Sequence, residues 1–291
     1  MTNNQEQAFA VPPEAWSTRV SAAIKLSDST TVGKPPIGAV RLQLSPTGPE
    51  RAPIRNLSGW YVYTDLPKGV YNVVVVSDYY LDAEISFVVD SAIETTPTIE
   101  VALLPNSSYP FPSDMTRIRG AVRLPATAAA ADVSDAAVRA VLFESEAGLL
   151  ATLAEDTTTG GTKLKLGGLT AGSVTAGTIV LLKDPRANRL EYARITAPLP
   201  ANPSAEGYTT AEPLRYPHAA GTYVYAMKEA VTVQSKADNR GEFVLPLVRM
   251  PLHRGFVVLT ITLAGFRTVY RDIQCDEGSE SSPGIITLLS I

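Results

Sequence analysis

The sequence predicts an all-β protein with two tandem β-sandwiches, the second of which is interrupted by a small inserted β-barrel or β-sandwich. Its 291 residues are 45% hydrophobic and 19% charged, with 20 Gly and 22 Pro, a mixture that favours strands and turns. The chain also repeats itself, because residues 19–24 and 39–44 resemble the residues 98 positions later. Residues 58–62 match at an offset of 182 instead, so the second copy carries about 84 additional residues.

These matches give a domain map for the chain. A length of 291 residues suggests about two domains, and modules of roughly 80–100 residues can bury a core without metals or disulfides. We expect a flexible N-terminal arm at 1–15, a first β-sandwich at 16–105, a Pro/aromatic linker at 106–114, a second β-sandwich at 115–143 and 230–291, and an inserted small β domain at 144–229.

The arm is polar and has no hydrophobic periodicity, yet it carries Phe9, Val11 and Trp16 beside the Pro12-Pro13 pair. A short extended segment with spaced apolar anchors suits strand addition to, or groove docking on, a neighbouring subunit. The alternative is a frayed terminus in which only Trp16 packs against its own module.

The first sandwich follows the arm as a series of short apolar runs separated by Gly, Pro, Asn and Asp turns, the pattern of an antiparallel sandwich. Strands are expected at 20–26, 39–44, 59–64, 71–77, 83–89 and 98–104. In the fourth strand the alternate residues Tyr71, Val73 and Val75 are expected to fill the core.

The linker is rich in proline, which fixes φ and predicts an extended, semi-rigid segment. Its aromatic residues Tyr109 and Phe111 are candidates either for packing between neighbouring modules or for contact with a partner.

The second sandwich and the inserted domain are expected to be mostly strands, although the alanine-rich segment 126–137 fits a short helix or a loop equally well. The expected strands are 163–166, 178–183, 191–197, 208–210 and 222–228 in the insert, and 231–234, 241–245, 256–263, 268–274 and 285–289 in the resumed sandwich.

The charge and the cysteine content limit which partners the protein can have and which compartment it folds in. There are 25 Lys+Arg against 29 Asp+Glu, and the basic residues are scattered, which disfavours a nucleic-acid surface. Cys275 is the only cysteine, so no intramolecular disulfide can form and a reducing cytoplasm is the natural setting. The polar first residues do not fit a signal peptide, and the apolar run 255–265 is far shorter than the ~20 residues of a membrane helix. We expect a cytoplasmic assembly without membrane insertion.

The sequence offers few residues for chemistry, and we expect no catalytic residue, cofactor or metal site. His218 and His253 are the only histidines and lie in no metal-ligand spacing. No nucleophile elbow or phosphate loop is present. His218 is expected to be a hydrogen-bonding loop residue, and a hidden hydrolase would need a pocket that holds one of these histidines beside a nucleophile.

Residues 56–71 carry a Gly-aromatic strand, a Leu-Pro-x-Gly turn and a Tyr-x-Val-x-Val strand in that order. This segment resembles the carboxypeptidase-regulatory-like (transthyretin-like) β-sandwich family, so a transthyretin-like or immunoglobulin-like sandwich is implied. The segment 103–120 is similar to one in such proteins associated with contractile injection systems, the phage-tail-like particles of bacteria. Segments 190–195 and 213–222 resemble small β domains of phage-tail and baseplate proteins.

The resemblance implies a non-enzymatic structural subunit of a contractile injection system or phage-tail-like particle, at a cap or the baseplate periphery. Its partners would be other subunits of the particle, and the chain would form a homo-oligomer there. The alternative is a fibre-like or adhesin-like binding module that recognises a carbohydrate or a protein receptor. Exposed aromatic side chains around Tyr61, Tyr63, Tyr79 and Tyr80 would favour this alternative.

Overall fold

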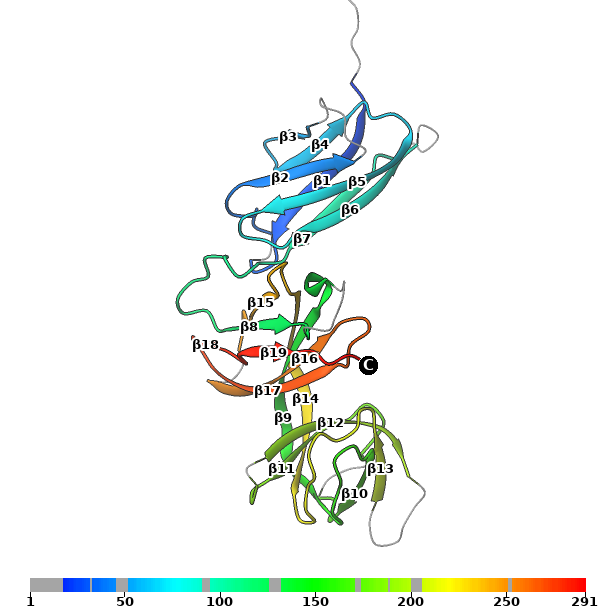
Figure 1. The fold of residues 1–291 in the computed structure, drawn as a ribbon, viewed down its shortest axis with the longest axis vertical. Coiled ribbons are helices and arrows are strands. Elements are labelled where there is room, and N and C mark those ends of the chain that lie inside the picture. The colour runs from blue at the N-terminus through cyan, green and yellow to red at the C-terminus, as the bar shows by residue number, and fades with distance from the viewer. Residues whose placement is uncertain are drawn as a thin grey trace, which may run out of the picture. The chain divides into compact units, whose positions relative to one another are not determined.

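The computed structural model describes residues 18–31, 33–45, 52–90, 95–125, 132–170, 174–187, 189–199, 206–250 and 253–291. The fold is all-β, as the sequence predicts: the described residues contain 19 strands, no α-helix, and one 3-10 turn at Val133–Asp135. The chain forms two compact units, Met1–Leu104 and Pro105–Ile291, called the first and second unit below (Figure 1).

The first unit contains two sheets. One has the strand order β3-β4-β1-β7 and the other β2-β5-β6. All strand pairs are antiparallel except β1 and β7, which run parallel. The strands are β1 (Val20–Asp28), β2 (Val40–Ser45), β3 (Ile54–Arg55), β4 (Trp60–Thr64), β5 (Gly69–Ser77), β6 (Ala83–Val89) and β7 (Thr98–Leu103).

The core of the first unit lies between these two sheets. Tyr71, Val73 and Val75 alternate into it and are buried, as their spacing predicts. Across the core, the ring of Tyr63 on β4 lies 6.2 Å from that of Phe87 on β6, so the sheets pack face to face as a β-sandwich.

The four tyrosines whose exposure would have favoured a binding module are mostly inside this core. Tyr61, Tyr63 and Tyr80 are buried and Tyr79 is half-buried. These tyrosines therefore do not form the exposed aromatic patch that would have favoured a fibre-like or adhesin-like binding module. The reason is strand alternation: Tyr61 and Tyr63 lie two residues apart on β4, so both side chains project to the same inner face.

One part of the second unit is again a pair of sheets. Strand β8 (Arg117–Arg123) pairs antiparallel with β15 (Glu242–Pro246) and parallel with β18 (Glu280–Ser281) and β19 (Ile285–Thr287). The other sheet places β16 (Arg254–Thr262) between β9 (Ala137–Leu153) and β17 (Val269–Asp276). A single cluster of buried side chains from both sheets, including Ile118, Phe243 and Val257, forms the sandwich core.

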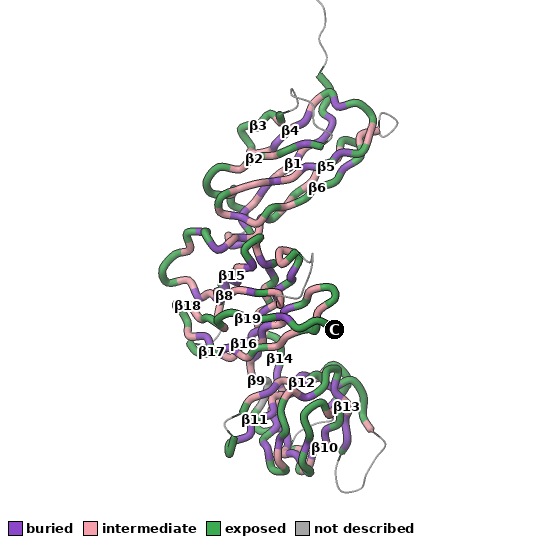
Figure 2. The backbone as a smooth tube through the Cα atoms, in the orientation of Figure 1, coloured by how far each residue is buried: buried purple, intermediate pink, exposed green. Residues whose placement is uncertain are grey.

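The other part of the second unit is a closed barrel. Its strands follow the order β10-β13-β12-β11-β14-β9, and β10 also pairs with β9, which closes the ring at six strands. They include β10 (Lys163–Gly167), β11 (Ile179–Asp184), β12 (Arg189–Pro198), β13 (Glu206–Thr210) and β14 (Tyr223–Lys236). The interior holds a separate apolar core with Leu164, Leu182 and Ile195. In Figure 2, buried residues colour stretches of the backbone in the sandwich and in the barrel.

Strands β9 and β14 belong to both parts of the second unit. The sequence places module boundaries at 143/144 and 229/230, but β9 and β14 continue through these positions without a break. Their pairing contains register shifts between Val224/Tyr225, Tyr225/Met227 and Glu229/Val231. Such bulges bend a strand pair and increase its twist, so the open sheet curls into the barrel without ending either strand.

Two similar turns precede β4 and β15. In the first, the Asn56 side chain accepts a hydrogen bond from the Trp60 amide at 2.9 Å, and Gly59 has φ 83°. In the second, the Asp238 side chain accepts from the Glu242 amide at 2.8 Å, and Gly241 has φ 78°. Glycine is favoured at both positions because positive φ is strained for other residues.

Candidate functional site

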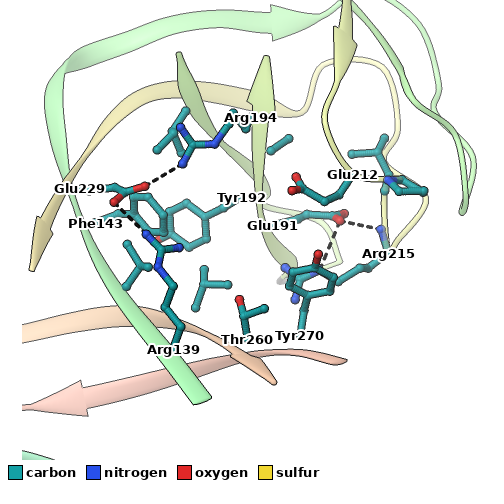
Figure 3. A pocket seen from close by; sticks show the side chains of 16 residues that line it. Arg139, Phe143, Glu191, Tyr192, Arg194, Glu212, Arg215, Glu229, Thr260 and Tyr270 are labelled. Carbon is teal, nitrogen blue, oxygen red and sulfur yellow. Dashed lines mark hydrogen bonds and ion pairs between the residues drawn. The ribbon is translucent and has the colours of Figure 1, made fainter. Parts of the chain in front are cut away.

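A cleft of about 110 Å³ lies in the second unit, where the barrel meets the sandwich (Figure 3). Strand alternation supplies its lining. On β9, Val138, Ala140 and Leu142 are buried in the sandwich core, so the intervening side chains of Arg139 and Phe143 face the cleft. On β16 and β17 the paired residues Thr260 and Tyr270 line it from the sandwich side.

The barrel contributes an aromatic wall. The ring of Tyr192 on β12 stacks on that of Phe143 with a centroid separation of 4.5 Å. Phe143 is buried together with Val141, Ile179 and Met227 in a small apolar cluster. Burial raises the pKa of Tyr192, and the nearby negative charge of Asp272 raises it further, so its hydroxyl stays protonated.

At one end of the cleft, Glu229 holds two arginines from different parts of the unit. Its carboxylate accepts from Arg139 of β9 at 3.1 Å and from Arg194 of β12 at 2.7 Å. Glu229 stands at a bulge of β14, a feature that commonly re-aims a side chain. Burial by itself would raise the pKa of Glu229, but the bond from Arg194 and the charge of Arg139 hold it below its ordinary value.

At the other end, Glu191 is buried and fully hydrogen-bonded. Its carboxylate accepts from His218 Nε2 at 2.8 Å, from the Arg215 amide at 2.5 Å and from the Tyr216 amide at 3.2 Å. Burial would raise the pKa of Glu191, yet these bonds and the charge of Arg215 keep it below its ordinary value. His218 is thus a hydrogen-bonding loop residue, as the sequence predicts, and it is buried. Its Nδ1 has no partner among the described residues.

Arg215 connects the barrel to the sandwich. Its Nη2 donates to both carboxylate oxygens of Asp272 on β17, at 3.1 and 2.9 Å, while its Nε lies 3.4 Å from Glu191. Its guanidinium also lies 5.9 Å from the ring centroid of Tyr270. Burial raises the pKa of Asp272, and the charge of Arg215 offsets only part of that effect.

Several polar groups of the cleft have no partner among the described residues. They are the hydroxyls of Tyr192, Thr260 and Tyr270 and the carboxylate of Glu212. The formal charges of the lining cancel, because three arginines (Arg139, Arg194, Arg215) meet three glutamates (Glu191, Glu212, Glu229). The cleft thus offers donors and acceptors beside an aromatic wall, without a net charge.

The residues that the sequence proposed as partner contacts lie elsewhere. Phe9, Val11 and Trp16 fall outside the described residues. Tyr109 is buried and Phe111 half-buried, with ring centroids 4.5 Å apart and Arg117 over Phe111 at 5.8 Å. Their role in partner contact stays a prediction.

Sequence reasoning missed the cleft itself. Arg139 lies in the segment that matches residues 39–44, and no motif marks it or the charged residues of the insert as parts of one site. The one available signal was the alternation of Arg139, Val141 and Phe143 on a strand whose other face is also apolar, a sign that both faces are covered.

The other candidate residues for chemistry are dispersed. His253 is exposed and bonded to Glu277, and Cys275 is buried in the sandwich core, where burial raises the pKa of its thiol. No three His, Cys, Asp or Glu residues of the described part of the chain are grouped as metal ligands. That part also contains no helix with the length and apolar character needed to cross a bilayer.

No family model and no curated protein matches the chain. Among solved structures it is similar to the Bacillus anthracis TIE protein (TM-score 0.25, 12% identity, 92% of this chain and 50% of that one). It is also similar to the Streptococcal ancillary pilin (TM-score 0.21, 10% identity, 94% of this chain and 70% of that one). The chain thus spans half the length of the first protein, and at these TM-scores neither likeness bears on fold or function.

Proposed function

We propose that this chain is a non-enzymatic structural subunit of a contractile injection system or phage-tail-like particle, positioned at a cap or the baseplate periphery. The observation that carries the proposal is the passage of β9 and β14 from sandwich to barrel without interruption. Two hydrogen-bonded strands shared by two cores, with Arg215 and Asp272 bonded across the junction, make a stiff element. Stiffness of this kind suits a part that holds position and transmits load.

We further propose that the chain contains two copies of one transthyretin-like sandwich, the second with the barrel inserted. The strand pairings support this, since β1 pairs antiparallel with β4 and parallel with β7, and β8 does the same with β15 and β19. The three-stranded order β2-β5-β6 likewise has its counterpart in β9-β16-β17. Repetition of one rigid module is a common way to build an extended assembly component.

Within the particle, the proposed contacts are made by the N-terminal arm and by sheet edges, with other subunits and further copies of this chain as partners. The assembly forms in the cytoplasm. A fibre-like or adhesin-like binding module remains a second candidate, because the cleft is a concave site with unpartnered polar groups.

The direct test is to tag the chain at its C-terminus in its source cells and to isolate the native complexes. We expect sheath and tube subunits to co-purify in fixed ratios and the tag to mark one end of a tubular particle in electron micrographs. Recovery of the tagged chain without any such subunits, or its absence from purified particles, would overturn the proposal.

A further inference from the structure

We propose that the cleft between barrel and sandwich binds one neutral sugar ring of a glycan. This binding is independent of the assembly role proposed above, so either can fail without the other. The sugar-binding proposal rests on two sets of residues: the Phe143–Tyr192 stack, and the unpartnered hydroxyls of Thr260 and Tyr270.

The charges of the cleft argue against an ionic ligand. Each arginine of the cleft already has a carboxylate partner: Glu229 binds both Arg139 and Arg194, at 3.1 and 2.7 Å, and Asp272 binds Arg215 at 2.9 Å. A phosphate or carboxylate ligand would have to compete with these carboxylates for the arginines, and a cation would find only the Glu212 carboxylate without a partner among the described residues. A neutral ligand can use the remaining N–H groups and oxygen lone pairs without breaking any pair.

The unpartnered groups match the chemistry of a sugar. Hydroxyls of Thr260, Tyr192 and Tyr270 both donate and accept, the arginine N–H groups only donate, and the Glu212 carboxylate only accepts. A pyranose presents several adjacent hydroxyls that each need a donor and an acceptor within a few ångströms. Figure 3 shows Thr260 and Tyr270 on the side of the cleft opposite Arg194, so groups of both kinds surround its centre.

The aromatic wall and the size of the cleft further restrict the class of ligand to a single sugar ring. A pyranose has one face of C–H groups that packs on an aromatic ring, and the half-buried Tyr192 ring is fixed by its stack on Phe143. The cleft volume of about 110 Å³ is below the roughly 300 Å³ at which drug-sized ligand pockets begin. One ring would therefore enter while the rest of the glycan stays outside.

The test uses the full chain, with saturation-transfer NMR and calorimetry on the methyl pyranosides of glucose, galactose, mannose and N-acetylglucosamine. Glucuronate and adenosine serve as the acidic and the flat aromatic comparison. We expect saturable binding of at least one neutral glycoside, weakened about fivefold by Tyr270→Phe and by Thr260→Val, each of which removes one hydrogen-bonding hydroxyl. Tyr223→Phe is the matched control, because Tyr223 is exposed on a barrel strand and does not line the cleft.

Three results would overturn the proposal. The first is that no neutral glycoside binds, and the second is that glucuronate or adenosine binds more tightly than every neutral glycoside. The third is that the double variant Thr260→Val, Tyr270→Phe binds as well as Tyr223→Phe. Near-isosteric changes keep the comparison free of folding effects, and unchanged thermal unfolding of each variant verifies this.

Discussion

Arg215, on the loop after β13, and Asp272, on β17, are joined by Nη2 contacts of 3.1 and 2.9 Å to both carboxylate oxygens. One residue belongs to the barrel and the other to the sandwich, and both side chains are largely withdrawn from solvent, at 20% and 17% exposed. Glu191 completes the chain of contacts on the barrel side. The pair therefore fixes the barrel against the sandwich at a point away from the shared strands.

Arg215→Met should destabilise the second unit by about 2–4 kcal/mol, because it leaves the carboxylates of Glu191 and Asp272 close together without their cation. Urea unfolding followed by far-UV circular dichroism measures the effect. Tryptophan fluorescence serves as an internal reference, since Trp16 and Trp60 both precede residue 105. Arg267→Met is the control, because Arg267 is exposed and should change stability by less than about 0.5 kcal/mol. Equal behaviour of the two variants would mean that the pair contributes nothing.

Tyr63→Phe should stabilise the first unit by about 1 kcal/mol at neutral pH. The Tyr63 hydroxyl is buried and has no hydrogen-bond partner among the described residues, so its removal relieves a desolvation cost. Tyr71→Phe is the matched comparison, because the Tyr71 hydroxyl donates to the Pro67 carbonyl at 2.9 Å and its loss should destabilise by a similar amount. Tryptophan fluorescence during urea unfolding reports both. Destabilisation by Tyr63→Phe would show that the hydroxyl has a partner in solution.

The same tyrosine predicts a loss of stability in alkali. Burial raises the pKa of Tyr63 from 10.0 to about 12, so between these values the folded chain keeps a proton that the unfolded chain has lost. The folded state then binds more protons, and its free energy of unfolding falls as pH rises through this window. Stability measured at about pH 9 and 11.5 should fall less in Tyr63→Phe than in the wild type. Parallel losses in the two proteins would contradict the assignment.

Gly59 and Gly241 occupy similar turns but should respond differently to alanine. Both have positive φ, which costs an alanine about 1 kcal/mol. A Cβ on Gly59 would meet nothing within 4 Å, whereas on Gly241 it would lie 2.3 Å from the Val122 carbonyl oxygen. We expect Gly59→Ala to cost about 1 kcal/mol and Gly241→Ala at least about 3 kcal/mol, since the backbone there must move. Urea unfolding followed by tryptophan fluorescence measures the stability of Gly59→Ala, and unfolding followed by circular dichroism measures that of Gly241→Ala. Equal losses of stability would contradict the expected difference between the two turns.

The barrel should be dispensable for folding of the sandwich that carries it. The sandwich core and the barrel core share no buried residue, and only a small third cluster, in which Val141 and Phe143 pack against Ile179 and Met227, lies between them. Replacing about 146–229 with a short Gly-Ser turn should leave a chain with cooperative thermal unfolding, because closure of a loop costs little. The full chain melted in parallel is the control. A non-cooperative melt of the shortened chain, with dye binding typical of a molten state, would mean that the barrel is part of one shared core.

Deletion of residues 2–13 tests the arm. The deletion removes Phe9 and Val11 but keeps Trp16. We expect the truncated chain to fold but no longer to join its assembly. Co-purification of tagged wild-type and truncated chains with the other subunits gives the comparison, with replacement of Phe9 and Val11 by Ser as a full-length control. Normal incorporation of the truncated chain would leave the arm without a role in contact.

The sequence by itself determined the strands and many of the turns. Period-two alternation at Tyr71, Val73 and Val75 and the glycines at 59 and 241 are local signals, since they depend on side-chain direction and on φ. The tyrosines of β4 show the limit of such signals. Their alternation was visible, but whether the face that they share is covered depends on a second sheet.

The tertiary structure alone decided where the modules meet. The boundaries expected at 143/144 and 229/230 lie within β9 and β14, because bulges allow a strand to leave one sheet and enter another without ending. The cleft forms because β9 and β14 pass from the sandwich into the barrel. Arg139, Glu191, Arg215 and Asp272 are far apart in sequence, and closure of the barrel against the sandwich brings them together. No local pattern encodes such a meeting, because it depends on long-range strand pairing.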